Sequence, residues 1–334
     1  MLHLVYNSDG GFVMPTLVSA ASAVAWTSDL SQLVIHVLDT GIEDDEWWKF
    51  EETLRHRFGV EFGIQRHQID CALFAGLRKW RGVSYATYAR VLDAEVLKEV
   101  SWCLHCDGDT LFTDDPLNIC AEYDSSCAMQ GHVDWQKAGI PSAQQLWFQD
   151  KGLGWDPEQY VCCGVMLVNL DWFRANDVAE KCLDFLRRYP DAPFVDQEPL
   201  NYFCRGKIGY LPNRWGMFSW DAFRTVRPGC LHYASDLPWK LMTNRYLDYN
   251  DAHKLWFFYV EKLLGFRFGT MVEGGVRPFI FARKMAFRMV FKVVRALCSL
   301  VPVLSHSAIG DYCLRHYSSK RQWRELTDGL CDRR

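Results

Sequence analysis

The chain has 334 residues, of which 49% are hydrophobic, 23% charged and 15% aromatic. This much apolar and aromatic side chain can offset the entropy lost on ordering a chain of this length. The composition therefore excludes disorder as the main state and predicts one large or two modest globular domains.

The formal net charge of −4 is distributed unevenly along the chain. Residues 277–334 contain 12 Lys and Arg against 4 Asp and Glu, whereas the remaining residues contain 25 and 37. The acidic majority of the chain lacks the clustered cations that neutralise phosphates, so we expect no nucleic acid partner.

Compartment signals come from the N-terminus and from the cysteines. The first residues show no basic start ahead of a long apolar run, so no secretory signal is expected. The 13 cysteines are scattered without a spaced disulfide framework, which favours a reducing, cytosolic compartment. One local pair, Cys103 and Cys106, leaves open a weaker interpretation as half of a zinc site or as a redox motif.

Short apolar runs alternate with helical patterns along the first part of the chain. We expect strands at residues 2–6, 33–38, 60–64 and 102–106, and helices at residues 15–26, 43–58 and 85–100. Later strands are expected at 161–170, 208–211 and 230–234, and later helices at 178–189 and 196–204. Strands separated by helices of this length predict an α/β fold with a mostly parallel sheet and covered faces.

Polar clusters follow two of the expected strands, where an open α/β sheet binds its ligands. The first strand is followed by Asn7, Ser8 and Asp9, and the fourth by Asp107, Gly108 and Asp109. A glycine between two carboxylates lets both side chains converge on one point, and such oxygen ligands suit Mg²⁺ or Mn²⁺. The same tripeptide is also common in solvated turns, but its place after a buried strand favours a metal site.

Two further positions allow both a structural and a functional interpretation. His232, in an expected strand, is either a partly buried structural residue or a third metal ligand. Asp196 and Gln197 open an expected helix, where the carboxylate either caps the helix or, with the amide, orients a substrate hydroxyl.

With these clusters in order, the chain resembles family 8 of the retaining glycosyltransferases between about residues 2 and 240. The resemblance is carried by VYNSD at 5–9, SYATYAR at 84–90, LHCDGDTL at 104–111, CGVMLVNL at 163–170, DQEPLN at 196–201, and HY and PW at 232–233 and 238–239. It implies the GT-A fold of that family, a Rossmann-like, mostly parallel sheet flanked by helices.

The resemblance also implies roles for the residues that match the family's motifs. Asp107, Asp109 and His232 match the ligands of a manganese ion on the diphosphate of a UDP-sugar, a place that Mg²⁺ could also take. The matched donor-binding positions are Asn7, Ser8, Asp9, Arg90, Gly108, Ser235 and Lys240. Asp196 and Gln197 match positions beside the transferred sugar, and we expect them to support it electrostatically while the acceptor attacks from the same face.

The chain departs from the family pattern at three places. Cys162-Cys163-Gly164, in the sugar and acceptor region, stands where the family usually has Asn-Ala-Gly. Ser235 replaces an expected glycine, and Leu237 replaces the lysine that usually precedes Pro-Trp, so Lys240 is expected to reach the phosphate instead. These departures leave the identity of the sugar open.

The basic tail is expected to form an amphipathic helix. Between residues 277 and 300 there are six basic residues and no acids. One helical stripe is formed by Lys284, Arg288, Lys292 and Arg295, and the other faces are apolar and aromatic. We expect this region to dock on an anionic membrane surface, and the alternative is a helix packed on the catalytic domain with its basic face in solvent, so in both cases the basic stripe faces outward.

Together these features predict a catalytic domain at residues 1–264 and a basic helical extension at residues 265–334. The expected activity is retaining transfer of a hexose, galactose or glucose, from a UDP-hexose to a glycan or lipid-linked glycan, as in lipopolysaccharide or other surface-glycan synthesis. The expected location is the cytoplasm, peripheral on the inner face of the membrane. The alternative is a UDP-sugar-binding or glycan-binding protein of the same fold with impaired catalysis.

Overall fold

The structure is a computed structural model that describes residues 1–79, 84–133, 142–154, 160–223, 226–243, 248–301, 304–305 and 307–331. The chain divides into two compact units. Unit 1 comprises Met1–Leu17, Ser28–Gly108 and Leu117–Pro212, and unit 2 comprises Val18–Thr27, Asp109–Pro116 and Asn213–Arg334. The boundary expected between residues 264 and 265 lies inside unit 2.

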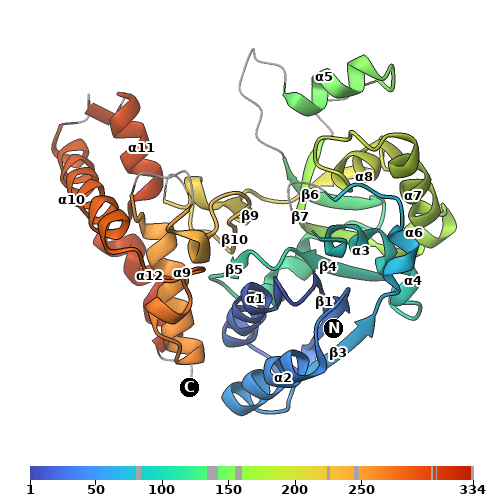
Figure 1. Ribbon diagram of the computed structural model, residues 1–334, viewed down its shortest axis with the longest axis horizontal. Helices are drawn as coiled ribbons and strands as arrows, with labels where there is room; N and C mark the ends of the chain where they lie inside the picture. The colour runs from blue at the N-terminus through green and yellow to red at the C-terminus, as the bar shows by residue number, and fades with distance from the viewer. Residues whose placement is uncertain are drawn as a thin grey trace. The chain divides into compact units, whose positions relative to one another are not determined.

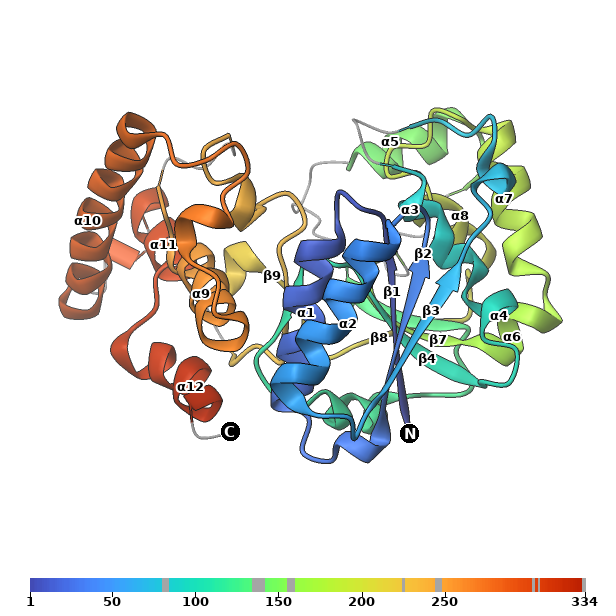
Figure 2. The same ribbon diagram turned by 60° about the horizontal axis from the view of Figure 1, so that its bottom comes forward.

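Unit 1 is built on a seven-stranded sheet with the strand order β3-β2-β1-β4-β7-β6-β8. The strands are β1 (Leu2–Ser8), β2 (Leu33–Asp39), β3 (Gly63–Gln68), β4 (Trp102–Cys106), β6 (Met129–Val133), β7 (Val161–Asn169) and β8 (Ile208–Tyr210). The first four in chain order are parallel neighbours, and β1, β2 and β3 run side by side in Figure 2. Because β7 is antiparallel to both β4 and β6, the sheet is mixed but mostly parallel.

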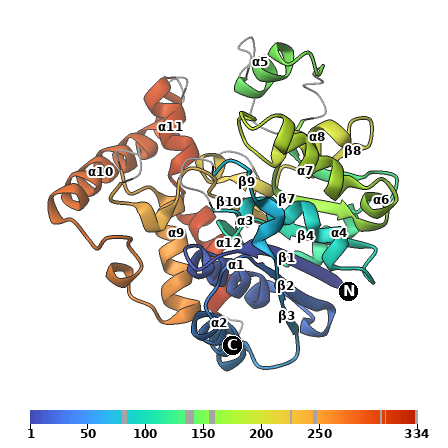
Figure 3. The same ribbon diagram turned by 45° about the vertical axis from the view of Figure 1, so that its right-hand side comes forward.

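Unit 1 also contains helices. They are α2 (Asp44–Phe58), α3 (Ala86–Ala89), α4 (Asp93–Val96), α5 (Ala143–Asp150), α6 (Leu170–Ala175), α7 (Val178–Arg188) and α8 (Gln197–Phe203). The apolar side of α7 packs with α8, and α8 contacts β7 (Figure 3). The predicted ends of α2 are confirmed, since Glu43 precedes its first turn and Gly59, at φ 86°, follows its last residue.

Two predicted elements of unit 1 differ from the structure. The strand expected at 60–64 is β3, which begins at Gly63 and continues through polar residues to Gln68, because an edge strand needs no continuous apolar run. The helix expected at 85–100 is divided into α3 and α4 by a 3₁₀ turn at Arg90–Leu92. This tighter turn carries the buried Arg90 described below.

Unit 2 contains a three-stranded sheet with the order β5-β10-β9. Its strands are β5 (Thr110–Phe112), β9 (Trp215–Phe218) and β10 (Cys230–His232), with β10 antiparallel to β5 and parallel to β9. Helix α1 (Val13–Trp26) supports β5, because Ser22 Oγ accepts a hydrogen bond from the Phe112 amide at 2.9 Å. Ser19 Oγ lies 2.6 Å from Thr110 Oγ1.

Helices follow these strands in the described part of unit 2. It contains α9 (Asp251–Tyr259), α10 (Pro278–Leu300), α11 (Ala308–His316) and α12 (Lys320–Cys331). Helices α10 and α11 pack against each other (Figure 1). Within the described residues, no helix has the length and apolar character needed to cross a membrane. The predicted fold class, an α/β protein with a helical C-terminal region, is confirmed.

The basic stripe of α10 does not face outward as expected from the sequence. Arg288 forms an ion pair with Asp251 of α9, and Lys292 Nζ lies 2.5 Å from the same carboxylate. Arg295 donates to the Tyr317 carbonyl at 3.2 Å, and Lys284 is buried. The sequence shows the spacing of the cations but not the buried carboxylate that binds Arg288 and Lys292. The expectation that this stripe lies on the surface was therefore wrong.

The outward face of α10 is apolar instead. Its exposed large side chains are Phe279, Met289, Val290, Val293, Leu297 and Leu300, which we call the apolar stripe. The last five are separated by one, three, four and three residues, and Phe279 lies eleven residues, about three turns, before Val290, so all six lie on one side of the helix. The exposed alanines that lie between these positions add no polar group to the stripe. Among the described side chains of α10, the exposed charged one is Arg283.

Candidate active site

The tripeptide Asp107-Gly108-Asp109 follows β4 directly. The Asp107 amide donates to the Gly164 carbonyl of β7 at 2.8 Å, which fixes the backbone where the strand ends. A Cβ atom at position 108 would come within 2.9 Å of the Phe12 ring and closer still to Thr16. Close approach by α1 therefore requires glycine between the two carboxylates.

Asp109 and His232 are brought together by the sheet of unit 2. His232 of β10 is paired with Thr110 of β5, and the Tyr233 amide donates to the Asp109 carbonyl at 2.9 Å. His232 Nε2 lies 3.3 Å from Asp109 Oδ1, and both side chains are buried. The two residues, distant in sequence, are thus neighbours because β5 and β10 are antiparallel partners.

Asp107 joins this pair. Asp107, Asp109 and His232 each offer one ligand atom, and these three atoms lie within 4.8 Å of one another. Among the described residues, they are the group of His, Cys, Asp or Glu side chains placed closely enough to hold a metal ion. Two carboxylate oxygens and one imidazole nitrogen are a donor set that suits Mn²⁺ or Mg²⁺. Cys103 and Cys106 belong to no such group in the described chain, so the zinc or redox interpretation gains no support.

Arg90 lies at the centre of the polar cluster in unit 1. Its guanidinium forms an ion pair with Asp107, donates to the Cys163 carbonyl, and places Nε 2.8 Å from Asp196 Oδ2. Burial disfavours a charged guanidinium, but the two carboxylates outweigh burial and raise the pKa of Arg90. The arginine is therefore a permanent cation beside the strand end.

Asp196 is held from two sides. Arg90 pairs with one carboxylate oxygen, and Thr87 Oγ1 donates to the other at 2.6 Å. Burial nevertheless raises the pKa of Asp196, against the lowering effects of the Arg90 charge and the Thr87 hydrogen bond. Asp196 precedes α8, but among the described residues its carboxylate makes no capping hydrogen bond to that helix and is held by Arg90 and Thr87 instead, so the capping interpretation is not supported.

Gln197 is fixed at the first residue of α8. Its Oε1 accepts from the Cys163 amide at 3.0 Å, and its Nε2 donates to the Tyr160 hydroxyl at 3.2 Å. Cys162 and Cys163 are buried in β7, and Cys163 meets the cluster through its backbone amide and carbonyl. Gln197 and the Cys162-Cys163-Gly164 segment are brought together by the structure.

The polar residues after β1 lie in the same unit. Asn7 Nδ2 donates to the Ala86 carbonyl at 2.6 Å, and Asn7 Oδ1 lies 2.8 Å from His105 Nε2. His105 Nδ1 lies 2.6 Å from the Asp93 carboxylate, so the Asn7 amide is held in one orientation. Ser8 is buried and accepts from Thr16 at 3.2 Å, whereas Asp9 is partly exposed in the following turn.

The last two predicted donor residues follow β10. Ser235 is exposed in a turn that begins at Ala234, whose φ of 43° is left-handed. Lys240 ends a 3₁₀ turn and lies 3.6 Å from Glu273, with both side chains well exposed. An exposed ion pair of this kind contributes little energy, so Lys240 can leave Glu273 at small cost.

Comparison with known families matches residues 3–227 to "Glycosyl transferase family 8". The chain belongs to glycosyl transferase family 8. General stress protein A of Bacillus subtilis is 22% identical to it over 236 residues, which cover 69% of this chain and 79% of the relative. The glycosyltransferase GlyB of Streptococcus pneumoniae is 22% identical over 196 residues, 54% of this chain and 43% of that protein.

Solved structures agree with this membership at the level of the fold. The galactosyltransferase LgtC, crystallised with donor and acceptor sugar analogues, has a TM-score of 0.61 and 23% identity, covering 71% of this chain and 89% of LgtC. GlyE of Streptococcus pneumoniae has a TM-score of 0.56 and 16% identity, covering 82% of this chain and 62% of GlyE. The family 8 chain is thus a glycosyltransferase with the GT-A fold.

Several polar residues around the family 8 site were not identified from the sequence. Thr87, Tyr160 and Glu198 contact Asp196 or Gln197 directly or through one another. Thr87 and Glu198 lie inside two of the motifs that carry the family resemblance. Their polar side chains within these motifs could have marked them as site residues. Tyr160 precedes β7 and carried no pattern of its own.

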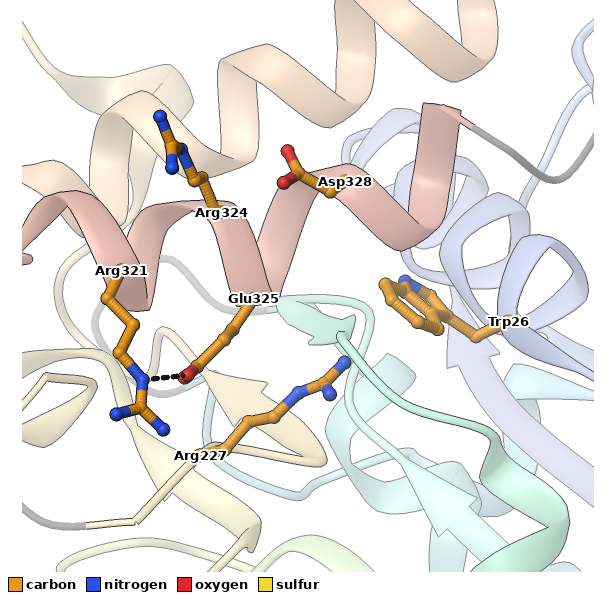
Figure 4. Close-up of a pocket in the computed structure, with 6 residues that line it drawn as sticks. All are labelled: Trp26, Arg227, Arg321, Arg324, Glu325 and Asp328. Atoms are coloured by element: carbon orange, nitrogen blue, oxygen red, sulfur yellow. Dashed lines mark hydrogen bonds and ion pairs between the residues drawn. The ribbon is translucent and has the colours of Figure 1, made fainter.

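A cavity of about 390 Å³ lies elsewhere in unit 2. It is lined by Trp26, Arg227, Arg321, Arg324, Glu325 and Asp328 (Figure 4). Arg321 pairs with Glu325 at 2.7 Å, and the Arg227 guanidinium lies 5.5 Å from the centre of the Trp26 ring. None of these residues is a candidate for donor or metal binding.

Proposed function

We propose that this family 8 glycosyltransferase moves a hexose, galactose or glucose, from a UDP-hexose to a hydroxyl group of a glycan or lipid-linked glycan, with retention at the anomeric carbon. The observation that carries the proposal is the convergence of Asp107, Asp109 and His232 at the end of β4, where Asp107 also meets Arg90. This combination offers ligands for a divalent cation and a fixed positive charge for a diphosphate.

Asp107, Asp109 and His232 fit a divalent cation, because three ligand atoms of suitable chemistry already lie within 4.8 Å of one another. We assign Mn²⁺ to this site, with Mg²⁺ as the alternative. When bound there, the cation would supply positive charge to the leaving diphosphate. The protein holds the three ligands by the β4 strand end and by the β5–β10 pairing.

Arg90 supplies the second positive charge in this proposal. Cleavage of the bond to the anomeric carbon leaves negative charge on UDP and positive character on the sugar. A buried guanidinium that is already ordered by Asp107, Asp196 and the Cys163 carbonyl needs little reorganisation to stabilise the diphosphate. Asn7, Ser8 and Asp9 bind the uridine part of the donor, and Ser235 and Lys240 complete the phosphate side.

Asp196 and Gln197 support the sugar. Gln197 is a neutral amide, which is a poor nucleophile, and its Oε1 accepts from the Cys163 amide. We therefore favour attack by the acceptor hydroxyl on the face that UDP leaves, with the Asp196 charge and the Gln197 amide stabilising the developing positive charge. Cys162 to Gly164 lie next to Gln197 and so influence which hexose fits.

The alternative of a binding protein with impaired catalysis is not favoured. The replacements Cys162 and Leu237 leave the three candidate ligands together and leave Gln197 bonded to the backbone of β7. Cys163 contributes to this bond through its amide, which any residue other than proline would provide.

We expect Mn²⁺-dependent release of UDP from one of UDP-galactose, UDP-glucose and their N-acetyl forms. The test is a screen of the four donors with the full chain, with and without Mn²⁺ and with chelator as control. Release from one donor that stops on chelation supports the proposal. Tight donor binding without any release, with acceptor glycans present, would favour the binding-protein alternative.

We further propose that the enzyme works on the inner face of an anionic membrane and docks there through the apolar stripe of α10. Phe279 is 93% exposed at one end of the stripe and Leu300 is 77% exposed at the other. Arg277 and Arg283 are exposed at the N-terminal end, and no acid occurs between residues 277 and 310. An apolar face accompanied only by cations suits an interface of acyl chains and anionic headgroups.

Charge placed on the stripe should weaken docking. We expect the Met289→Glu/Val293→Glu variant to bind vesicles of phosphatidylcholine and phosphatidylglycerol at least about tenfold more weakly than wild type, because two carboxylates oppose both insertion and headgroup charge. Co-sedimentation measures this. Val60→Glu is the matched control, since Val60 is 74% exposed in unit 1.

Other results would redirect the docking proposal. Equal vesicle binding by wild type and the stripe variant would exclude this face as the membrane contact. If wild type forms a dimer, the stripe variant is monomeric and neither binds vesicles, the stripe is the contact with a second copy of the chain. Point variants are preferable to truncation at residue 264, because truncation removes the partners of the buried Asp251.

A further inference from the structure

A buried hydrogen-bond chain connects Gln197 to a carboxyl group that the mechanism above does not use. The Gln197 amide donates to the Tyr160 hydroxyl at 3.2 Å, and this hydroxyl lies 3.1 Å from Glu198 Oε1 as its donor. The other Glu198 oxygen accepts from the Phe194 amide at 2.9 Å. With the Cys163 amide on Gln197 Oε1, both ends of the Gln197 side chain are engaged.

All three side chains of this chain are buried. Glu198 is 0% exposed, Tyr160 is 3% exposed and Gln197 is 9% exposed. Burial of a carboxyl group costs free energy that its hydrogen bonds must offset, and an apolar residue would fill the same volume at less cost. A buried carboxyl group at this position therefore suggests a role beyond packing. Burial raises the pKa of Glu198 to about 8, against the lowering effects of the Phe194 and Tyr160 hydrogen bonds.

We propose that Tyr160 and Glu198 are positioning residues that hold the Gln197 amide in one orientation for sugar transfer, and that ionisation of Glu198 strengthens this hold. The inference rests on the proposed function, because it assigns the chain a purpose in the reaction. Tyr160 contacts Gln197, and Glu198 contacts Tyr160. Neither residue is among the proposed donor-binding residues or metal ligands.

The two states of Glu198 place the Tyr160 proton differently. When Glu198 is ionised, its carboxylate accepts a hydrogen bond from the Tyr160 hydroxyl group. The lone pairs of the tyrosine oxygen are then available to accept a hydrogen bond from Gln197 Nε2. A protonated Glu198 can instead donate to that oxygen and compete with Gln197 for its lone pairs. The amide is therefore better fixed when the carboxyl group is ionised.

Among the described residues, the charged and polar groups that act on Glu198 come from its own helix turn and from the segments packed against it. Asp196, on the same turn, opposes ionisation of Glu198, and the Phe194 amide and Tyr160 hydroxyl favour it. Arg90 partly neutralises Asp196 through its ion pair at 2.8 Å. Ionisation of Glu198 thus depends on groups that this cluster itself supplies.

The test compares Tyr160→Phe and Glu198→Gln with wild type in Mn²⁺-dependent UDP release. We expect kcat to fall on the order of tenfold to a hundredfold in both variants, because a misplaced group costs this much, while KM for the UDP-sugar changes little. Wild-type kcat should rise as the pH passes through about 8, and Glu198→Gln should lack this rise. Tyr202→Phe is the control, since Tyr202 packs on the same aromatic cluster.

A second readout does not depend on activity. The Gln197 side-chain NH₂ resonance, assigned through its loss in Gln197→Glu, should be protected from hydrogen exchange in wild type and lose that protection in Tyr160→Phe. If wild type released no UDP, the proposed function would fail while this measurement still judged the positioning role. Unchanged Gln197 protection in Tyr160→Phe, or unchanged kcat and pH profile in both variants, would overturn the inference.

Discussion

Replacement of Asp109 by Asn is expected to lower kcat for UDP-sugar turnover by about two to three orders of magnitude. The amide has the shape of the carboxylate but not its charge, so the candidate metal site loses a ligand oxygen of the required kind. The fold should persist, because the bond from the Tyr233 amide to Asp109 uses the backbone carbonyl, and β5 still pairs with β10.

The measurement is steady-state UDP release by the full chain over a range of Mn²⁺ concentrations. We expect Asp109→Asn to need more Mn²⁺ for half-maximal rate as well as to reach a lower maximum. Asp70→Asn is the control for the loss of a carboxylate charge outside the site, because the Asp70 side chain accepts from the Ala72 amide in an exposed turn. A wild-type rate with unchanged Mn²⁺ dependence in Asp109→Asn would contradict the metal assignment.

Asp107 should respond differently from Asp109. Asp107→Ala removes a candidate ligand but also removes one of the two carboxylates that neutralise the buried Arg90. We therefore expect loss of turnover together with a modest loss of stability, since an uncompensated buried charge is costly. Comparison of unfolding in the two variants separates the role of Asp107 in holding Arg90 from its role as a ligand.

The buried strands of unit 1 were predictable because burial leaves a clear pattern in the sequence. Strands β1 and β4 lie inside the sheet and read as apolar runs with polar residues at their ends. The polar edge strand β3 carries no such run, and its position was misjudged by a few residues. The same reasoning explains why the carboxyl ends of β1 and β4 were predicted as ligand positions.

The limits of sequence reasoning are clearest at α10. The sequence revealed the helix and its basic stripe, but a stripe of cations can face lipid headgroups or a buried carboxylate equally well. Asp251 lies on α9, which was not predicted at all, and this residue decides the matter. Long-range pairing of this kind leaves no local pattern, and neither does the contact of Tyr160 with Gln197.

Asp251 organises the contact between α9 and α10. It is 1% exposed, and it pairs with Arg288 and with Lys292 at 2.5 Å. The amide and hydroxyl of Ser318 donate to the same carboxylate, at 2.9 and 2.7 Å. Burial opposes the charge of Asp251, but the two cations outweigh burial and lower its pKa.

The Asp251→Ala variant is expected to lose about 3 to 5 kcal/mol of unfolding free energy, because Arg288 and Lys292 remain partly buried without a counter-charge. Chemical denaturation measures the loss, and hydrogen exchange in peptides from α10 should show that it opens first. Asp328→Ala, which removes an exposed carboxylate from α12, is the control. The double variant Asp251→Ala/Lys292→Met should recover part of the loss, since it removes one of the orphaned cations.

The pH dependence gives a second check on Asp251. Its pKa is lowered in the folded protein from an ordinary value of 3.8, so its contribution is present above that value and is lost as the pH falls below it. Wild type and Asp251→Ala should therefore differ most near neutral pH and converge in acid. Because the same carboxylate turns the basic stripe inward, its loss should also weaken vesicle binding through the apolar stripe. A variant as stable as wild type at pH 7, with α10 equally protected, would refute this account of the C-terminal helices.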